Sequence, residues 1–234
     1  MGEVDHTRAN EWWVPRFGPR RFRLLVGLSF YPYTLMNGCY VLIGSLLAPV
    51  VHYDRMAGMF AVYLLEVGVA AHSLDAMGSN RPWGGLLTKS QLALLAMSGL
   101  IPGLAVGLFY ALSYAILLLP LGALELFFLL SYNLEWFGGT FHTDFWFAAS
   151  WGLLPVLVGY AAQTNTLGVD SLAAGLFGFF TAYVEINASR PYRELRSQDG
   201  GPSAIAARLE SILKGVVASV LAAAAFLLAF SLLR

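Results

Sequence analysis

Long apolar runs constrain this chain more than any other feature of its sequence. A helix that crosses a hydrocarbon layer of roughly 30 Å needs about 20 apolar residues. Seven stretches approach that length, and they cover residues 24–50, 56–72, 91–109, 112–131, 145–163, 168–187 and 211–233. A helix satisfies its own backbone polar groups, which lipid cannot do. The runs therefore predict an all-α, polytopic membrane helical bundle with about seven transmembrane helices.

The composition supports a membrane setting and excludes several other classes. Hydrophobic residues make up 58% of the chain, charged residues only 12%, and the mean hydropathy is +0.65. These values exceed what the core of a soluble domain of this length requires. The formal net charge is zero, which gives no reason to expect a nucleic-acid partner. The single cysteine, Cys39, excludes a disulfide framework within the chain.

The basic residues predict the domain boundaries and the orientation. Residues 1–23 form a polar, basic and aromatic arm without the apolar stretch of a cleavable signal peptide, and residues 24–234 form the transmembrane domain. Twelve of the 14 Lys and Arg residues lie in this arm and in the connections after the second and sixth runs. Because basic residues favour the cytoplasmic side, we expect a multi-pass membrane protein with a cytoplasmic N-terminus and a C-terminus on the opposite side.

Unusual polar residues concentrate in the segments that follow the second, fourth and sixth runs. These segments read "AHSLDAMGSNRPWGGLLTK", "SYNLEWFGGTFHTDFWF" and "AYVEINASRPYRELRSQDGG". Segments that follow even-numbered spans all lie at the same membrane face. A helical bundle can therefore bring the polar side chains of these three segments together. Imidazole and carboxylate groups bind metals or relay protons, and the candidate metal ligands are His72, Asp75, Glu135, His142, Asp144 and Glu185. The alternative is that these are caps and solvated loop residues.

Two further acids stand inside apolar runs. Glu66 occurs in "AVYLLEVGVA" and Glu125 in "LGALELFFLL". Ionisable groups inside a membrane are costly and commonly face the bundle interior or water. Both acids are therefore candidates for a functional role, and the alternative is a buried structural hydrogen bond to a neighbouring span.

The order of these segments resembles the UbiA-type intramembrane prenyltransferase superfamily. In that superfamily an NDxxDxxxD motif ends the second span and runs into an RP turn, a Tyr/Lys-bearing loop follows the fourth span, and a DxxDxxGDR motif ends the sixth. The resemblance covers about residues 20–230 and rests on position more than on motif. It implies a UbiA-like helical fold and a transferase that acts on an isoprenoid or lipid substrate, with magnesium held against a diphosphate.

The resemblance also implies roles for individual residues. The implied catalytic positions are Asp75, Glu185 and Tyr132, and the implied phosphate-binding positions are Arg81, Arg190 and Arg193. Several positions depart from the family pattern: His72, Ser79, Ala188 and Tyr192 stand where acids are usual, and Glu135 stands near the usual lysine. The chain also has seven runs where the family usually has nine spans. With fewer carboxylates than the family pattern, the chain would bind magnesium more weakly. The negative charge of Glu135, near the position of the usual lysine, would repel a diphosphate.

Three functional hypotheses follow. The first is a prenyltransferase-like enzyme that uses magnesium. The second is a membrane enzyme that has kept the fold and uses the histidines with the acids to bind zinc, iron or manganese. The third is a non-catalytic protein that binds an isoprenoid or quinone, or that serves as a subunit of a membrane complex. A lipid or isoprenoid is the expected partner, and self-association into a homo-oligomer stays open.

Overall fold

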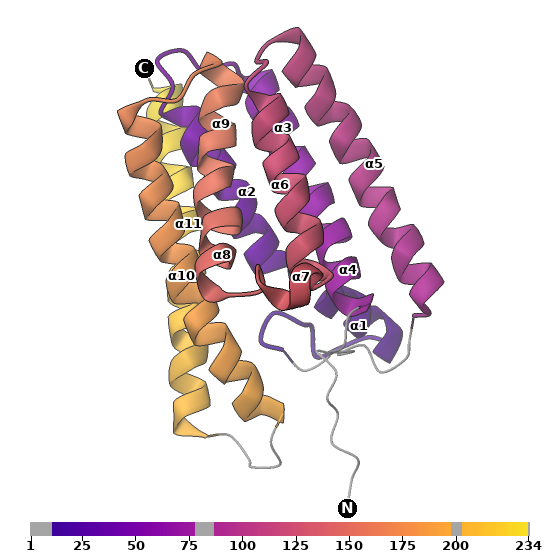
Figure 1. Cartoon of the computed structure of the whole chain (residues 1–234). Coiled ribbons are helices and arrows are strands. Elements are labelled where there is room, and N and C mark those ends of the chain that lie inside the picture. The colour runs from indigo at the N-terminus through magenta and orange to yellow at the C-terminus, as the bar shows by residue number, and fades with distance from the viewer. Residues whose placement is uncertain (1–10, 78–86, 198–202, 234) are drawn as a thin grey trace, which may run out of the picture.

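The computed structural model describes residues 11–77, 87–197 and 203–233, and these residues form helices and connecting loops. The helices are α1 (Arg20–Ser29), α2 (Tyr31–Leu46), α3 (Tyr53–Leu65), α4 (His72–Met77), α5 (Lys89–Ser113), α6 (Leu118–Asn133), α7 (Trp136–Gly139), α8 (Asp144–Ala148), α9 (Leu154–Thr164), α10 (Val169–Ser197) and α11 (Ala204–Leu232). Two π-helical segments, η2 (Glu66–Ala71) and η3 (Ala149–Leu153), join α3 to α4 and α8 to α9. The long helices run up and down the bundle side by side (Figure 1).

The structure confirms an all-helical bundle in its described residues, with helices suited to a membrane. Five helices are long and apolar enough to cross one, and they cover Tyr53–Met77, Lys89–Ser113, Asp144–Thr164, Val169–Arg196 and Ala204–Leu232. Each of the seven predicted runs is largely helical, but α2 and α6 have only 16 residues each. The membrane character is thus supported, while the count of seven spans stays a prediction.

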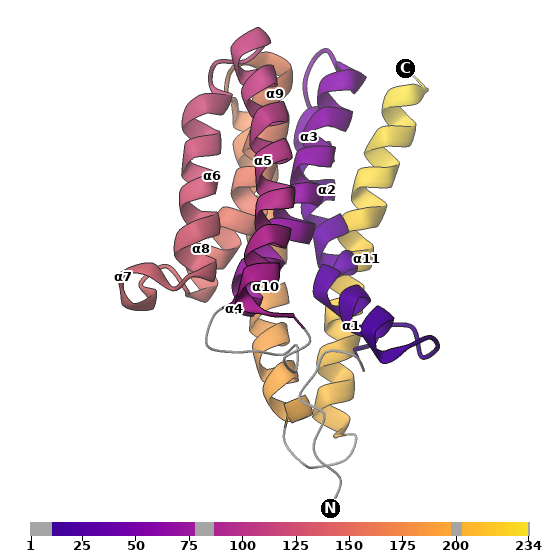
Figure 2. The ribbon, with the colours of Figure 1, turned by 90° about the vertical axis from the view of Figure 1, so that its right-hand side faces the viewer.

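The first predicted run, residues 24–50, is broken into two helices. Phe30 adopts a left-handed backbone conformation, with φ of 42° and ψ of 39°, which ends α1 and starts α2. A residue in this conformation cannot continue a right-handed helix. Helix α1 therefore turns away from α2 at the lower end of the bundle (Figure 2), and it crosses the predicted boundary between arm and transmembrane domain at residue 23.

Close contacts between small residues hold the centre of the bundle together. A Cβ atom on Gly44 of α2 would lie 1.9 Å from the Val156 carbonyl oxygen, and one on Gly159 of α9 would lie 2.1 Å from the Val41 carbonyl oxygen. Only glycine lets the two backbones approach this closely, as is common where membrane helices pack. The Ser45 hydroxyl adds a hydrogen bond of 3.0 Å to the Gly159 carbonyl. Helices α2 and α9 thus form the central contact of the fold.

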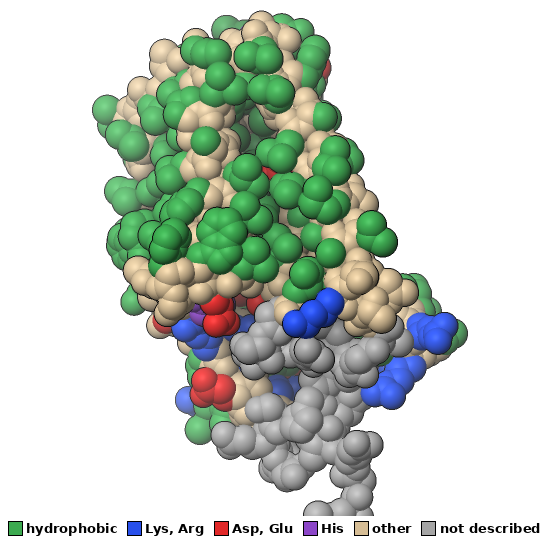
Figure 3. Space-filling model, turned by 45° about the vertical axis from the view of Figure 1, so that its right-hand side comes forward, with side chains coloured by type: hydrophobic (Ala, Val, Ile, Leu, Met, Phe, Trp, Pro, Cys, Tyr) green, Lys and Arg blue, Asp and Glu red, His purple; other side chains and the backbone are tan. Residues whose placement is uncertain are grey.

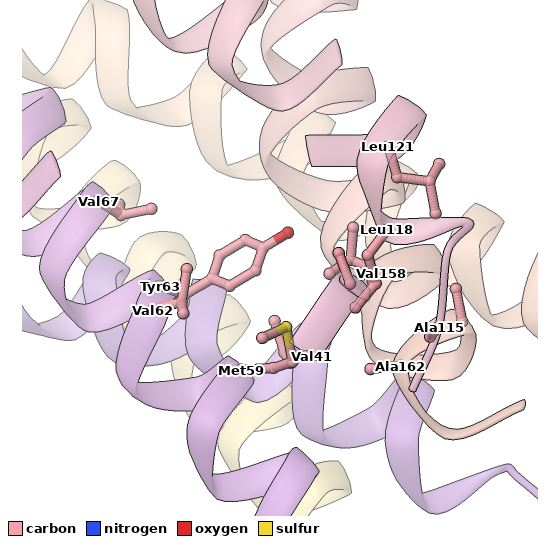
Figure 4. Packing of buried hydrophobic residues seen from close by; sticks show 12 residues of the cluster. Val41, Met59, Val62, Tyr63, Val67, Ala115, Leu118, Leu121, Val158 and Ala162 are labelled. Atoms are coloured by element: carbon pink, nitrogen blue, oxygen red, sulfur yellow. The ribbon is translucent and has the colours of Figure 1, made fainter. Parts of the chain in front are cut away.

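A buried apolar cluster extends this contact toward α3 and α6. Figure 4 shows Val41, Met59, Leu118 and Val158 facing one another, with the Tyr63 ring beside them. These side chains come from α2, α3, α6 and α9. The cluster fixes the mutual positions of the helices whose lower ends carry the polar residues.

Charged side chains gather at one end of the bundle. Figure 3 shows a body covered with hydrophobic side chains and, below it, a group of Lys, Arg, Asp, Glu and His side chains. Helices α10 and α11 extend beyond the other helices at this end (Figures 1 and 2). We call it the polar end, and it contains His72, Asp75, Tyr132, His142, Asp144, Glu185, Arg190 and Arg193.

Candidate functional site

The polar end is built from three segments that are far apart in the sequence. Helix α4 contacts α6, the turn segment α7 also contacts α6, and helix α8 contacts α10. This arrangement agrees with the prediction that the segments after the second, fourth and sixth runs meet at one face. The site therefore draws on α4, on the α6–α8 connection and on α10.

Tyr132 and His142 form the centre of the α6–α8 connection. Their rings stack with centroids 4.3 Å apart, and His142 Nδ1 lies 3.0 Å from the Tyr132 carbonyl oxygen. Because a carbonyl only accepts hydrogen bonds, Nδ1 must carry the proton in this contact. A neutral His142 therefore keeps its lone pair on Nε2. Tyr132 itself is buried, with 7% of its surface exposed.

Arg190 joins α10 to this connection through three groups. Its Nε lies 2.9 Å from Asp144 Oδ1, and its Nη2 donates to the His142 carbonyl oxygen at 3.3 Å. The Tyr132 hydroxyl is the third group, and it lies near enough for the charge of Arg190 to act on it. Asp144 is the first residue of α8, where the helix dipole also favours a negative charge. The arginine is therefore held in place rather than left free in solvent.

Glu185 is the most deeply buried acid of the polar end. Only 4% of its surface is exposed, and its Oε2 atom has no hydrogen-bond partner among the described residues. Arg193, two helical turns further along α10, is the positive charge that acts on it. Arg193 and Asp75 also lie near enough to the Tyr132 hydroxyl for their charges to act on it. An acid, two arginines and a tyrosine therefore share one region of the polar end.

His72 occupies a different environment from His142. Its ring stacks on Phe30 with centroids 4.5 Å apart, and its Nε2 lies 3.3 Å from the Thr34 hydroxyl oxygen. The Thr34 hydroxyl donates its own proton to the Ser29 carbonyl at 2.9 Å, so it can only accept from His72. His72 therefore carries its proton on Nε2, in contrast to His142.

The structure does not bring all the predicted site residues together. Glu135 is exposed and adopts a positive φ of 51°, at the start of the α7 turn. Arg81 and Ser79 lie outside the described residues. Within residues 11–77, 87–197 and 203–233, no three His, Cys, Asp or Glu side chains stand close enough to hold a metal ion. Asp144 is paired with Arg190 instead of with another acid. The described side chains alone thus do not fit the metal site predicted from the six candidate ligands.

Glu66 and Glu125 lie away from the polar end, inside the bundle. The Tyr63 hydroxyl donates a hydrogen bond to Glu125 Oε1. This contact agrees with the alternative given for the two acids, a buried structural hydrogen bond to a neighbouring span. Tyr63 itself was not predicted as the partner, although its spacing of three residues from Glu66 places both on one face of a helix. No sequence spacing indicated the contact between Thr34 and His72, because the two residues belong to separate helices.

Comparison with known proteins identifies no relative of this chain. No family model, curated protein or solved structure matches the chain. The resemblance to the UbiA-type superfamily therefore stands as a hypothesis that rests on the order of the sequence segments, and the function must be argued from the geometry of the polar end.

Proposed function

We propose that this protein binds an isoprenoid or a similar membrane lipid with an anionic phosphate head group, and that it acts on this head group at the polar end. The apolar tail would lie against the helices, whose outer surface is hydrophobic (Figure 3). The observation that carries the proposal is the grouping of Arg190, Arg193 and the Tyr132 hydroxyl at the membrane-level end of an apolar bundle.

The chemistry of these three groups suits a phosphate. Arginine presents several N–H donors in a planar fork that matches phosphate oxygens, and a tyrosine hydroxyl adds a further donor. Among the described residues, Arg193 uses its Nε–H on the Ser189 carbonyl at 3.3 Å, which leaves its terminal nitrogens for an anion. Arg190 is positioned by Asp144 and by the His142 carbonyl. We assign head-group binding to Arg193 and Tyr132. Arg190 contributes a second positive charge next to the head group.

The sequence resemblance makes prenyl transfer the reaction to test first. In that reaction the diphosphate leaves with its bonding electron pair, and arginines and a tyrosine hydroxyl stabilise the negative charge that develops on it. Asp75 and Glu185 are the acids implied by the resemblance. Because the described residues supply no complete set of metal ligands, we assign no step to a metal ion.

Equilibrium binding of a radiolabelled prenyl diphosphate to the protein in mild detergent tests the proposal. We expect the wild type to prefer the diphosphate over the prenyl alcohol of the same length. Arg193→Gln should weaken diphosphate binding by about tenfold or more, because a hydrogen bond to a charged group contributes roughly 1.5–3 kcal/mol. It should leave the alcohol unaffected. Arg208→Gln is the matched control, because Arg208 is exposed near the start of α11.

The outcomes separate the three functional hypotheses. Equal binding of diphosphate and alcohol, or equal effects of the two arginine variants, would contradict head-group recognition. Release of diphosphate by the wild type and its loss in Asp75→Ala supports a transferase, whereas specific binding without release supports a non-catalytic lipid-binding protein. Zinc, iron or manganese that co-purifies with the wild type and is lost in His72→Ala would favour the transition-metal hypothesis.

A further inference from the structure

A second polar site lies in the middle of the bundle, remote from the polar end. Glu66 stands near the centre of the Tyr53–Met77 span, and Glu125 near the centre of Leu118–Asn133. Tyr63 is 4% exposed and donates its hydroxyl proton to Glu125. Helix α5 closes against the other acid, because a Cβ atom on Gly103 would lie 2.6 Å from Glu66 Cγ.

These side chains border a small cavity that α3, η2, α6 and η3 share. Tyr63, Glu66 and Glu125 line it together with Ser150 and Trp151, and the free space suits about one water molecule. Figure 3 shows a hollow in the apolar surface in which an acidic side chain is visible. Glu66 and Glu125 are both only partly buried, so these acids lie among apolar spans without being sealed from their surroundings.

The two π-helical segments that the structure describes, η2 and η3, meet at this cavity. The segment η2 begins at Glu66, and η3 contains Ser150 and Trp151. A π-helical turn frees a backbone carbonyl and widens the helix, and such turns occur often at functional sites. Here the Trp151 carbonyl accepts a hydrogen bond of 2.6 Å from Asn37 Nδ2 of α2. The backbone therefore departs from regular helix on two sides of the same cavity.

The two acids share the cavity without a positive partner among the described residues. The titratable groups that face the cavity are Tyr63, Glu66 and Glu125, while α5 presents Gly103, and η3 presents Ser150 and Trp151. Among the described residues, no Lys, Arg or His pairs with either acid. Two negative charges that share a small cavity in a low-dielectric interior repel each other and lose hydration. Tyr63 donates to Glu125 only, so it stabilises the charge of that acid alone.

We propose that Glu66 and Glu125 form an intramembrane proton-exchange site, with Tyr63 as the hydrogen-bond donor and the cavity as the route of access. A proton from water binds one oxygen of a carboxylate and yields the neutral acid, and its release to water restores the carboxylate. No other bond forms or breaks. This site is separate from the head-group site, and it does not depend on the function proposed for the polar end.

Infrared spectroscopy of the purified, full-length protein tests this proposal. A protonated carboxyl has a C=O stretch that an ionised carboxylate lacks, and the difference spectrum between wild type and Glu66→Gln or Glu125→Gln isolates it. We expect a difference band that shifts to lower frequency when H₂O is replaced by D₂O, and that weakens as the pH is raised. Glu135→Gln is the control, because Glu135 is exposed and does not line the cavity.

Two glycines of α5 provide a second comparison that keeps both acids in place. Gly103→Ala places a methyl group against Glu66, whereas Gly107→Ala meets nothing within 4 Å. We expect Gly103→Ala to slow the exchange in D₂O severalfold and Gly107→Ala to leave it unchanged. A carboxyl band that fails to shift in D₂O, or that keeps its intensity at every pH, would overturn the proposal, because it would identify a sealed structural acid. The absence of any band lost with Glu66 or Glu125 would overturn it as well.

Discussion

The contact between α2 and α9 provides a quantitative test of the packing. Gly159→Ala places a methyl group 2.1 Å from the Val41 carbonyl oxygen, and neither backbone atom can rotate away. The helices must separate by roughly 1 Å to restore an ordinary contact. Such overpacking costs about 1–3 kcal/mol, and loss of the hydrogen bond from Ser45 adds about 0.6 kcal/mol. The sum is a destabilisation of about 2–4 kcal/mol.

A matched variant removes the effect of helix propensity from this comparison. Alanine is favoured over glycine in a helix by about 1 kcal/mol, and Gly122→Ala in α6 gains this benefit without a clash, because nothing lies within 4 Å. The free energy of unfolding can be measured by titration with a denaturing detergent, with helicity followed by circular dichroism. We expect Gly159→Ala to be less stable than Gly122→Ala by the full 2–4 kcal/mol estimated above. A difference below about 0.5 kcal/mol would refute the close contact.

Two further predictions concern the polar end. Asp144→Asn removes the negative charge 2.9 Å from Arg190 Nε, and we expect the affinity for an anionic prenyl diphosphate to rise severalfold in the binding assay; an unchanged affinity would contradict a role for Arg190 in binding the head group. Thr34→Val removes the acceptor of the His72 Nε2–H, and we expect the free energy of unfolding to fall by about 1 kcal/mol. Thr34→Ser keeps the oxygen, so an equal loss in Thr34→Val and Thr34→Ser would show that the hydrogen bond contributes nothing.

The sequence predicts the helical elements well because each apolar run indicates a helix without knowledge of its neighbours in the fold. A backbone in lipid must form its hydrogen bonds within the helix, so the length of each run is sufficient to indicate a helix. The grouping of Asp75, Tyr132 and Arg190 at one end could also be predicted, because alternate ends of consecutive antiparallel helices meet at the same face. Neither inference needs knowledge of which side chains touch.

The remaining features depend on contacts that a single sequence does not reveal. The Tyr63–Glu125 hydrogen bond joins residues 62 positions apart, so no local pattern indicates it. Phe30 has a left-handed backbone conformation, which a bulky residue rarely adopts. Glu135 was predicted as a ligand because of its position after the fourth run, but positive φ angles at Glu135 and Phe137 form a local turn that leaves its side chain exposed.

Photo-crosslinking tests the central claim most directly. A prenyl diphosphate analogue with a photoreactive group next to its diphosphate is bound to the wild-type protein in mild detergent, irradiated, and located by peptide mass spectrometry. The account predicts crosslinks in α4, near Tyr132, or in the part of α10 that carries Arg190 and Arg193, and competition by an unlabelled prenyl diphosphate. Crosslinks confined to the opposite end of the bundle, or labelling that the unlabelled compound does not reduce, would contradict the assignment of the polar end as the head-group site.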